Sequence, residues 1–306
     1  MKTSAPGDVI EVKNLTRKFR RKLALDDVSL RVPSGCVFGL IGENGAGKTT
    51  LINHLLGSYI PQKGKVRVLG LDPAQHPVDT LSRIGYLSED RIMPSWMRVH
   101  ELVKFTSAFY PNWDSSFAAE LLDVFNLDPA AQVKTLSKGE RAKAELLTAL
   151  AHRPDLLILD EPSSGLDVIV RQEILKSIVR DVAGEGRTVF FSSHLLGEVE
   201  RVSDYVAIMV RGKIVLAGSL DDVRTSHCRM TIRYPLPRNA QPIFEGVLSC
   251  TGSGQFWTII CSGHREQIRH AVEREEASIV DEQTPTLEEI FVARTKCEQS
   301  ALQAYR

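Results

Sequence analysis

The stretch GENGAGKT at Gly42–Thr49 limits the folds open to this chain more than any other part of the sequence. It fits the pattern G-x-x-x-x-G-K-[ST], which forms a loop around a phosphate when a buried strand precedes it and a helix follows. Both flanks are predicted, because CVFGLIG at 36–42 is a nearly continuous apolar run and KTTLINHLLG at 48–57 has a helical pattern that closes with a glycine. A glycine-rich turn with a chance lysine does not account for these flanks. The sequence therefore predicts a strand, a phosphate-binding loop and a helix.

The residue types in this loop match the chemistry of a nucleotide phosphate. Glycines let backbone N–H groups approach the β-phosphate, and the positive end of the helix dipole adds to the attraction. We expect Lys48 to bridge the β- and γ-phosphates and the Thr49 hydroxyl to ligate Mg²⁺. The expected nucleotide contacts are Gly42, Asn44, Gly45, Ala46, Gly47, Lys48, Thr49 and Thr50.

A second buried run, LLILD at 156–160, ends in a carboxylate and continues with Glu161 and Pro162. A phosphate loop of this kind needs an acidic partner at the end of a neighbouring strand. We expect Asp160 to hold the Mg²⁺ shell and Glu161 to orient and deprotonate an attacking water. One acid after a strand is as readily a helix N-cap, but that does not explain two adjacent acids before a proline. Successive strand residues point to opposite faces, so one acid can serve the metal while the other faces the γ-phosphate.

The remaining pattern predicts an α/β fold. Residues 9–32 alternate apolar and polar positions, as half-exposed antiparallel strands do, and TVFFSS at 188–193 is a third buried run. The segment 204–219 predicts a hairpin that closes the sheet, and residues 90–154 predict a helical insertion with a break at YPNWD. Buried runs that alternate with helices indicate a parallel sheet, here a mixed-sheet P-loop NTPase core with an antiparallel β lobe.

Beyond residue 225 the composition changes, which predicts a small C-terminal α+β domain. We therefore expect a nucleotide-binding domain at 1–225 and an accessory domain at 226–306. The accessory domain contains two strand-like runs, one helical run and a helix that starts with a capping box: MTIRY (230–234), FWTIICS (256–262), REQIRHAVERE (265–275) and PTLEEIFVAR (285–294).

Charge and hydropathy exclude several classes of protein. Lys+Arg and Asp+Glu number 38 each, so no net field favours nucleic acid or an anionic membrane. Apolar runs are far shorter than the roughly 18 residues that a membrane helix needs, and MKTSAPGDVI lacks the apolar core of a signal peptide. Five scattered cysteines without a CxxC pair suit a reducing compartment. We expect a cytoplasmic chain that does not bind nucleic acid but can dock on a membrane protein.

Four segments, in this order and spacing, resemble the nucleotide-binding subunits of ATP-binding cassette (ABC) transporters: GENGAGKTT, TLSKGE, LLILDEPSSGLD and FFSSH. The resemblance covers about Val9–Val223. It implies an ABC-type ATPase that uses ATP and Mg²⁺, with two subunits facing head to tail around two ATP molecules. The partner would be a second copy or a paralogous ATPase subunit, and the pair would drive a separate membrane permease from the inner face of the cell membrane.

The resemblance assigns three further residues, each of which also has a structural alternative. Phe19 matches an aromatic that stacks on adenine, although it could be a strand-end core residue. His194 matches the switch histidine that contacts the γ-phosphate, although a lone histidine is more often a satisfied strand-end residue. Asp167 matches the loop that crosses to the partner subunit, and it can cap the following helix as well.

The stretch TLSKGERAKAELL at 135–147 departs from the family pattern, in which LSGGQ is usual. Ser137 followed by Glu140 is a capping box, which is sufficient for a helix start. Ser137 and Gly139 are also the two positions that the family keeps, a hydroxyl donor and a residue without Cβ where the backbone approaches phosphate. Lys138 either adds a charge-assisted contact to the partner's nucleotide or is solvated. This segment has no lysine of a phosphate loop, metal ligand or base of its own, so we interpret it as half of a site that a second chain completes.

A second departure lies after the strand IGYL, where the family usually has a glutamine that reaches towards Mg²⁺ and the attacking water. Glu89 occupies that place here. A carboxylate can ligate magnesium more strongly than an amide, but it adds negative charge beside Glu161. The alternative is a solvated loop acid.

The resemblance favours export. YPNWD, ALAHRPDLLILDEP and TLEEIF are similar to cassettes paired with export-type permeases, and the insertion holds aromatics that either face such a permease or form the insertion's core: Trp96, Phe105, Phe109, Tyr110 and Trp113. A DNA-repair or chromosome-structuring ATPase would need a coiled coil or zinc modules between Lys48 and Asp160, and translation relatives resemble two fused cassettes. A soluble ABC-type ATPase that assists cofactor assembly, or DNA- or translation-related work, without a permease remains the alternative.

Overall fold

The structure is a computed structural model that describes residues 7–90, 93–181 and 186–304. Residues 1–6 lie outside this part; they begin the segment MKTSAPGDVI, for which no signal peptide is expected. Residues 91 and 92 of the predicted insertion also lie outside it. The chain forms two compact units, Met1–Leu216 and Ala217–Arg306. The domain boundary expected from the sequence lies between residues 225 and 226. In the structure the second unit begins earlier, at Ala217, because helix α8 (Leu220–Thr225) packs on strand β10 (His227–Arg238) of that unit.

A six-stranded sheet forms the centre of the first unit. Its strand order is β5-β6-β7-β3-β8-β9, and the first five strands pair in parallel. The strands are β5 (Ile84–Leu87), β6 (Leu156–Asp160), β7 (Thr188–Ser193), β3 (Val37–Ile41), β8 (Tyr205–Val210) and β9 (Lys213–Ser219). Every residue of β3, β6 and β7 is buried, which explains the apolar residues that make up most of each strand. In parallel pairing Asp160 lies opposite Ser192, and Ile41 opposite Ser193, so the carboxyl ends of these three strands meet at one edge.

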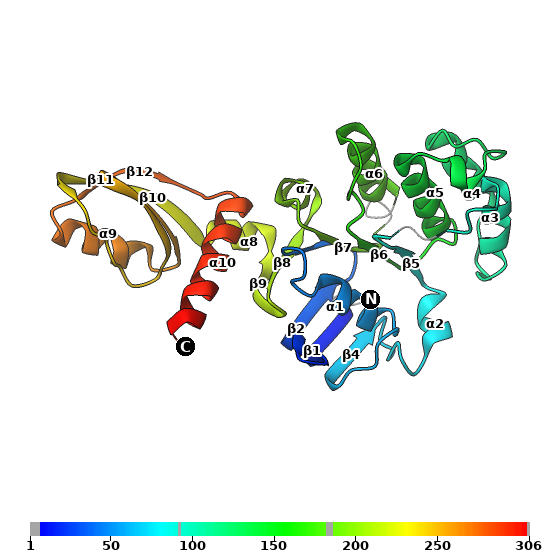
Figure 1. The fold of residues 1–306 in the computed structure, drawn as a ribbon, viewed down its shortest axis with the longest axis horizontal. Coiled ribbons are helices and arrows are strands. Elements are labelled where there is room, and N and C mark those ends of the chain that lie inside the picture. The colour runs from blue at the N-terminus through cyan, green and yellow to red at the C-terminus, as the bar shows by residue number, and fades with distance from the viewer. Residues whose placement is uncertain (1–6, 91–92, 182–185, 305–306) are drawn as a thin grey trace, which may run out of the picture. The chain divides into compact units, whose positions relative to one another are not determined.

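An antiparallel sheet with the order β2-β1-β4 covers one face of the large sheet, together with helix α1 (Lys48–Leu55) (Figure 1). Its strands are β1 (Asp8–Phe19), β2 (Lys22–Pro33) and β4 (Lys63–Val68). The main core lies between these layers and includes Val12, Leu25, Phe38, Leu51 and Phe190. Phe38 and Phe190, from neighbouring strands, stack with their ring centroids 5.7 Å apart. The predicted mixed sheet and antiparallel lobe are thus both present.

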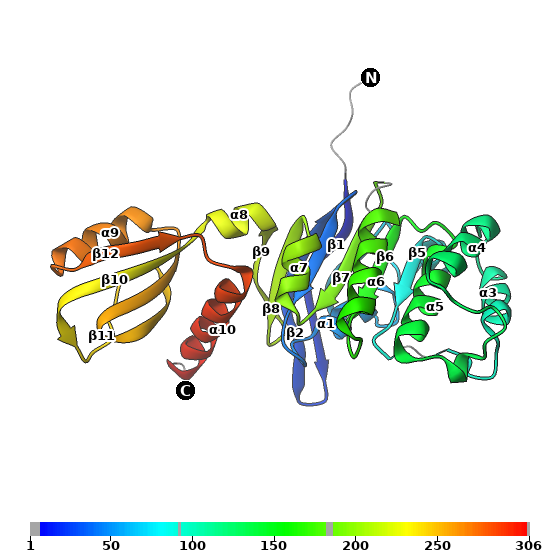
Figure 2. The ribbon, with the colours of Figure 1, turned by 90° about the horizontal axis from the view of Figure 1, so that it is seen from above.

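Helices α6 (Val168–Asp181) and α7 (Leu196–Val202) lie on the opposite face of the large sheet (Figures 1 and 2). A Cβ at Gly39 of β3 would lie 2.4 Å from Val199 Cγ1, so α7 packs directly against the strand backbone. The insertion contains α3 (Val99–Ser107), α4 (Ser115–Val124), a 3₁₀ turn η1 (Val133–Thr135) and α5 (Lys138–Leu150), and the short helix α2 (Pro77–Leu81) precedes it. In the described ranges, no helix combines the length and apolar character needed to cross a membrane.

The second unit has a three-stranded antiparallel sheet with the order β11-β10-β12, formed by β11 (Val247–Ser262), β10 and β12 (Ser278–Gln283). Helix α9 (Arg265–Arg274) packs on this sheet through Ile268 and Val272. Helix α10 (Leu287–Ala304) begins with the predicted capping box, in which Glu289 N donates to Thr286 Oγ1 at 3.2 Å and Thr286 N donates to Glu289 Oε2 at 2.9 Å.

Candidate active site

The loop Gly42–Thr49 joins β3 to α1, and its shape depends on glycine at two positions. Gly47 has φ 114°, and a Cβ there would lie 2.7 Å from the carbonyl oxygen of Ala24. A Cβ at Gly42 would lie 2.6 Å from the carbonyl oxygen of Met209. Because both obstacles are backbone atoms, a side chain at either glycine would displace the loop.

A pocket of about 430 Å³ opens beside this loop. Nine of the predicted site residues line it: Phe19, Asn44, Gly45, Gly47, Lys48, Thr49, Thr50, Glu89 and Glu161. Lys22 and Ala24 of β2 also line it and were not predicted, because only the pairing of β1 with β2 brings them to the loop. Gly42 and Ala46 do not line the pocket, and Ala46 is buried. The pocket therefore gathers residues from the phosphate loop, from the first strands and from the end of β6.

Phe19 lies at the end of β1 with 37% of its surface exposed. Its ring meets the edge of Tyr59 at 5.6 Å between centroids, and the guanidinium of Arg17 lies 4.6 Å from its centroid. Phe19 is thus a surface aromatic at the pocket rather than a core residue. An aromatic ring that lines a pocket provides a surface on which a flat base can stack.

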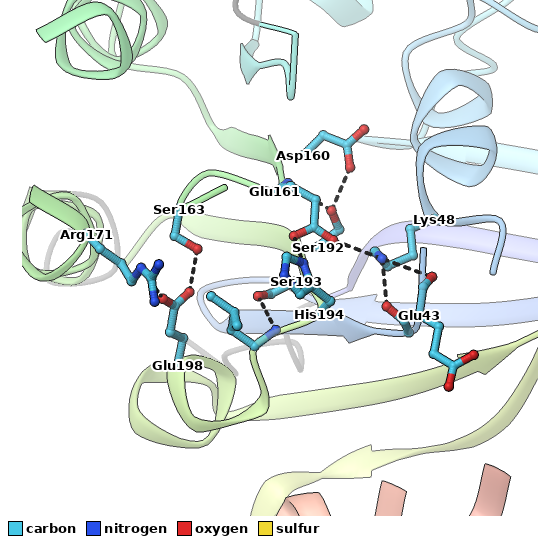
Figure 3. Close-up of polar contacts among 12 residues, drawn as sticks. Glu43, Lys48, Asp160, Glu161, Ser163, Arg171, Ser192, Ser193, His194 and Glu198 are labelled. Carbon is cyan, nitrogen blue, oxygen red and sulfur yellow. Dashed lines mark hydrogen bonds and ion pairs between the residues drawn. The ribbon is translucent and has the colours of Figure 1, made fainter. Parts of the chain in front are cut away.

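Glu161 follows β6 and is 3% exposed. Its Oε1 forms an ion pair with Lys48 Nζ at 2.9 Å, without hydrogen-bond geometry, and its Oε2 lies 2.7 Å from His194 Nδ1 (Figure 3). A carboxylate only accepts, so His194 Nδ1 carries the proton of this contact. Lys48 Nζ also donates to the carbonyl oxygen of Gly42 at 2.7 Å. The lysine, the acid and the histidine that the sequence singles out thus form one chain of contacts.

Asp160, at the end of β6, has a different partner. Ser192 Oγ donates to Asp160 Oδ1 at 2.6 Å and accepts from Glu161 N at 3.0 Å. Burial raises the pKa of Asp160, while the hydroxyls of Ser192 and Thr49 oppose that shift. Ser192 was missed by sequence reasoning, although a serine inside the buried run TVFFSS was a signal that its hydroxyl has a partner.

The residues around Asp160 fit a magnesium ion. The Oδ2 atom of Asp160 is buried without a hydrogen bond, and the Thr49 hydroxyl lies near the Asp160 carboxylate. Among the described residues no group of three or more His, Cys, Asp or Glu side chains could hold a metal by itself. Mg²⁺ suits such a site, because it is usually held by one or two protein oxygens together with phosphate and water.

Glu89 is exposed on the loop after β5 and lines the pocket. Partial burial raises the pKa of Glu89, and the negative charges of Asp160 and Glu161 raise it further. Three carboxylates therefore face one region and repel each other, an arrangement that a bound cation would relieve.

Ser137 and Gly139 do not line this pocket. Ser137 begins α5 with the predicted capping box, in which Glu140 N donates to Ser137 Oγ at 3.2 Å and Ser137 N donates to Glu140 Oε2 at 2.8 Å. A Cβ at Gly139 would lie 3.2 Å from the side chain of Val170. Asp167 also lies outside the pocket lining and caps α6 by accepting from Val170 N at 3.0 Å.

Comparisons with known proteins show which family and fold the chain resembles. A profile of the family described as ABC transporter matches residues 25–164. An uncharacterized ABC transporter ATP-binding protein of Methanocaldococcus jannaschii is 36% identical over 220 residues, which are 70% of this chain and 79% of the relative. A bacitracin transport ATP-binding protein of Enterococcus faecalis is 30% identical over 225 residues, 73% of each chain.

A solved structure, the ATP binding subunit of an ABC transporter, resembles this fold with a TM-score of 0.66 and 28% identity. The match covers 71% of this chain and 92% of the solved one.

Proposed function

Because this chain belongs to the ABC transporter family of ATP-binding proteins, we propose that it hydrolyses ATP in a head-to-tail pair of subunits that drives a separate membrane permease. The partner subunit is a second copy or a paralogue, and the direction of transport is export. The pair acts at the inner face of the cell membrane.

One observation carries the paired arrangement. The pocket holds Lys48, Thr49 and Glu161, whereas Ser137 and Gly139 do not line it although they begin a fully capped helix. The first N–H groups of a helix favour an anion, and Lys138 adds a positive charge at this helix start, but the segment has no phosphate loop of its own. We therefore assign it to the γ-phosphate of the nucleotide that the partner subunit holds.

The residues of this chain divide the work of hydrolysis. Lys48, at the start of α1, binds the phosphates together with the loop amides. Glu161 accepts a proton from the water that attacks the γ-phosphorus as the bond to the β-phosphate oxygen breaks. His194 holds Glu161 through the 2.7 Å contact and faces the γ-phosphate. Phe19 stacks on the adenine.

Magnesium, held by Thr49 and Asp160 with Glu89 beside them, would neutralise charge on the β- and γ-phosphates. The buried Asp160 oxygen without a hydrogen bond, and the Glu89 carboxylate whose pKa burial and Asp160 raise, support a cation there. Removal of divalent cation by a chelator should therefore abolish hydrolysis.

Coupling to a permease requires that ATP change how the two subunits associate. A shift from 1:99 to 99:1 in favour of the closed pair needs about 5.5 kcal/mol of preferential binding, which hydrolysis must then remove. The Ser137 contact to the partner's nucleotide is a source of that preference, since it exists only in the closed pair.

The surface of the helical insertion supports docking on another protein. Trp96, Phe105 and Phe109 are 72%, 47% and 65% exposed, so for these three the alternative of a core position fails. Tyr110 does belong to the interior, since it stacks on His152 at 3.8 Å. Exposed aromatics of this size favour a protein partner. The name of the Enterococcus relative, a bacitracin transport protein, supports a role in transport.

ATP hydrolysis by the purified chain tests the proposal. Lys48→Ala should abolish turnover and weaken ATP binding, whereas Glu161→Gln should bind ATP with wild-type affinity and hydrolyse it at least 100-fold more slowly. Reconstitution with a co-encoded multi-helix membrane protein should raise the wild-type rate. A rate that such a protein leaves unchanged would favour the soluble alternative, and full activity of Glu161→Gln would overturn the mechanism.

A further inference from the structure

Glu198 lies on α7, four residues after His194, and its side chain is 12% exposed. Its Oε2 accepts a hydrogen bond from Ser163 Oγ at 2.6 Å. Its Oε1 forms an ion pair with Arg171 Nε at 3.1 Å, without hydrogen-bond geometry (Figure 3). The proposed mechanism uses none of these three side chains.

The partners of Glu198 belong to the loop that follows Glu161. Ser163 is buried with 1% of its surface exposed, two residues after Glu161. Arg171 lies in the first turn of α6, and its Nη2 donates to the carbonyl oxygen of Leu166 at 3.1 Å. Glu198 is therefore linked to both ends of the loop that contains Asp167.

Two contacts thus join the same two chain segments. The first is His194 to Glu161 at 2.7 Å, and the second is Glu198 to Ser163 at 2.6 Å. The pairing of β6 with β7 fixes the two segments as far as Asp160 and Ser192, and these two contacts extend that connection beyond the strand ends. Reactions that depend on a positioned base lose rate when its orientation is loosened, even by about 1 Å.

Charge links Glu198 to the same pair. Burial raises the pKa of Glu198, while Ser163, Arg171 and His194 lower it and Glu161 raises it. The carboxylate is thus close enough to feel both reacting side chains, and Arg171 offsets its cost of burial.

We propose that Glu198 is a positioning residue, which holds the loop Ser163–Asp167 against α7 so that Glu161 and His194 stay in register for attack on the γ-phosphate. The inference rests on the proposed ATP hydrolysis. The inference adds to that function a link through Glu198 between the loop Ser163–Asp167 and the pair Glu161 and His194.

Steady-state hydrolysis by variants of the full chain tests the role. Glu198→Ala, which removes both contacts, should lower kcat about tenfold and leave the KM for ATP within twofold, because the phosphate loop is untouched. Glu198→Gln keeps an acceptor for Ser163 and should recover part of that loss. Ser163→Ala should lower kcat as well, and Glu198→Ala combined with Ser163→Ala should lose no more than the larger single effect. Glu120→Gln, an exposed acid on α4, is the matched control and should leave kcat unchanged.

A merely structural ion pair would give a different result. In that case kcat per folded molecule, with the folded fraction measured by circular dichroism, would equal the wild-type value in Glu198→Ala, and the proposal would fail. A rise in KM without a fall in kcat would also overturn it. The failure of the proposed function is seen separately, as absence of ATP hydrolysis by the wild-type chain or indifference of its rate to Lys48→Ala.

Discussion

For removal of the Ser192 hydroxyl, the structure gives a clear estimate of the loss in free energy of unfolding. Ser192 is fully buried, and its oxygen makes two hydrogen bonds, to the carboxylate of Asp160 and from the backbone N–H of Glu161. A hydrogen bond to a charged group contributes about 1.5–3 kcal/mol, and a buried N–H left without a partner costs about 1–3 kcal/mol. Ser192→Ala should therefore lower the free energy of unfolding by about 3 kcal/mol or more at neutral pH.

The neighbouring Ser193 provides a matched control. It is 1% exposed, and its Oγ accepts one neutral hydrogen bond from Leu195 N at 3.0 Å. Ser193→Ala should cost about 1 kcal/mol, the usual value for a neutral bond. Urea denaturation of both variants and of wild type at pH 7.5, with ATP omitted, gives the comparison. If Ser192→Ala costs no more than Ser193→Ala, the contact to Asp160 does not stabilise the site and the reasoning is refuted.

The pH dependence gives the Ser192 prediction a second test. Burial raises the pKa of Asp160 above its unfolded value, so between those two values the folded state binds more protons than the unfolded state. Stability therefore falls as pH rises through this window. Loss of Ser192, which opposes the shift, extends the window upward. The difference between wild type and Ser192→Ala should accordingly be larger at pH 8 than at pH 4.

Three further predictions concern His152, Gly139 and Phe19. Burial lowers the pKa of His152 from 6.5 to about 4, so as the pH falls the unfolded state takes up a proton before the folded state does. The free energy of unfolding should therefore fall between about pH 6.5 and pH 4, by about 2 kcal/mol at pH 5. Urea denaturation measures this loss, and His152→Gln should not show it. Gly139→Ala gains helix propensity but crowds Val170, so the free energy of unfolding should change by less than about 1 kcal/mol. ATPase activity should nevertheless fall, and unchanged activity would contradict a close approach of the Gly139 backbone to phosphate. Phe19→Ala should weaken ATP binding about tenfold and Phe19→Tyr should not, by fluorescence titration, and equal affinities would exclude stacking on adenine.

The parts of this fold that could be predicted are those whose sequence pattern lies within a few consecutive residues. A buried run before GENGAGKT and a helical pattern after it are found as β3 and α1, and the two capping boxes begin α5 and α10. Burial on both faces makes β3 and most of β6 and β7 apolar, with polar residues confined to Asp160, Thr188, Ser192 and Ser193, which is why these runs indicated a parallel sheet. These features depend on neighbours within a few residues.

Contacts between distant segments could not be predicted in this way. That Ser192 meets Asp160 follows from the pairing of β6 with β7, and no pattern within either strand gives that order or register. Glu198 meets Ser163 for a similar reason, since α7 returns to the loop after β6. The exposure of Trp96 depends on how the insertion packs, whereas its apolar character is compatible with a core position as well as with docking.

The central proposal, that two chains complete each ATP site, is tested most directly by sedimentation of Glu161→Gln with ATP. The monomer has a mass of 34.0 kDa, and the account predicts a species of twice that mass that forms only with ATP. Ser137→Arg in the same background should bind ATP and remain monomeric, because Ser137 faces the nucleotide only across the pair. ATP-bound Glu161→Gln that stays monomeric, or a dimer that Ser137→Arg leaves intact, would contradict the account.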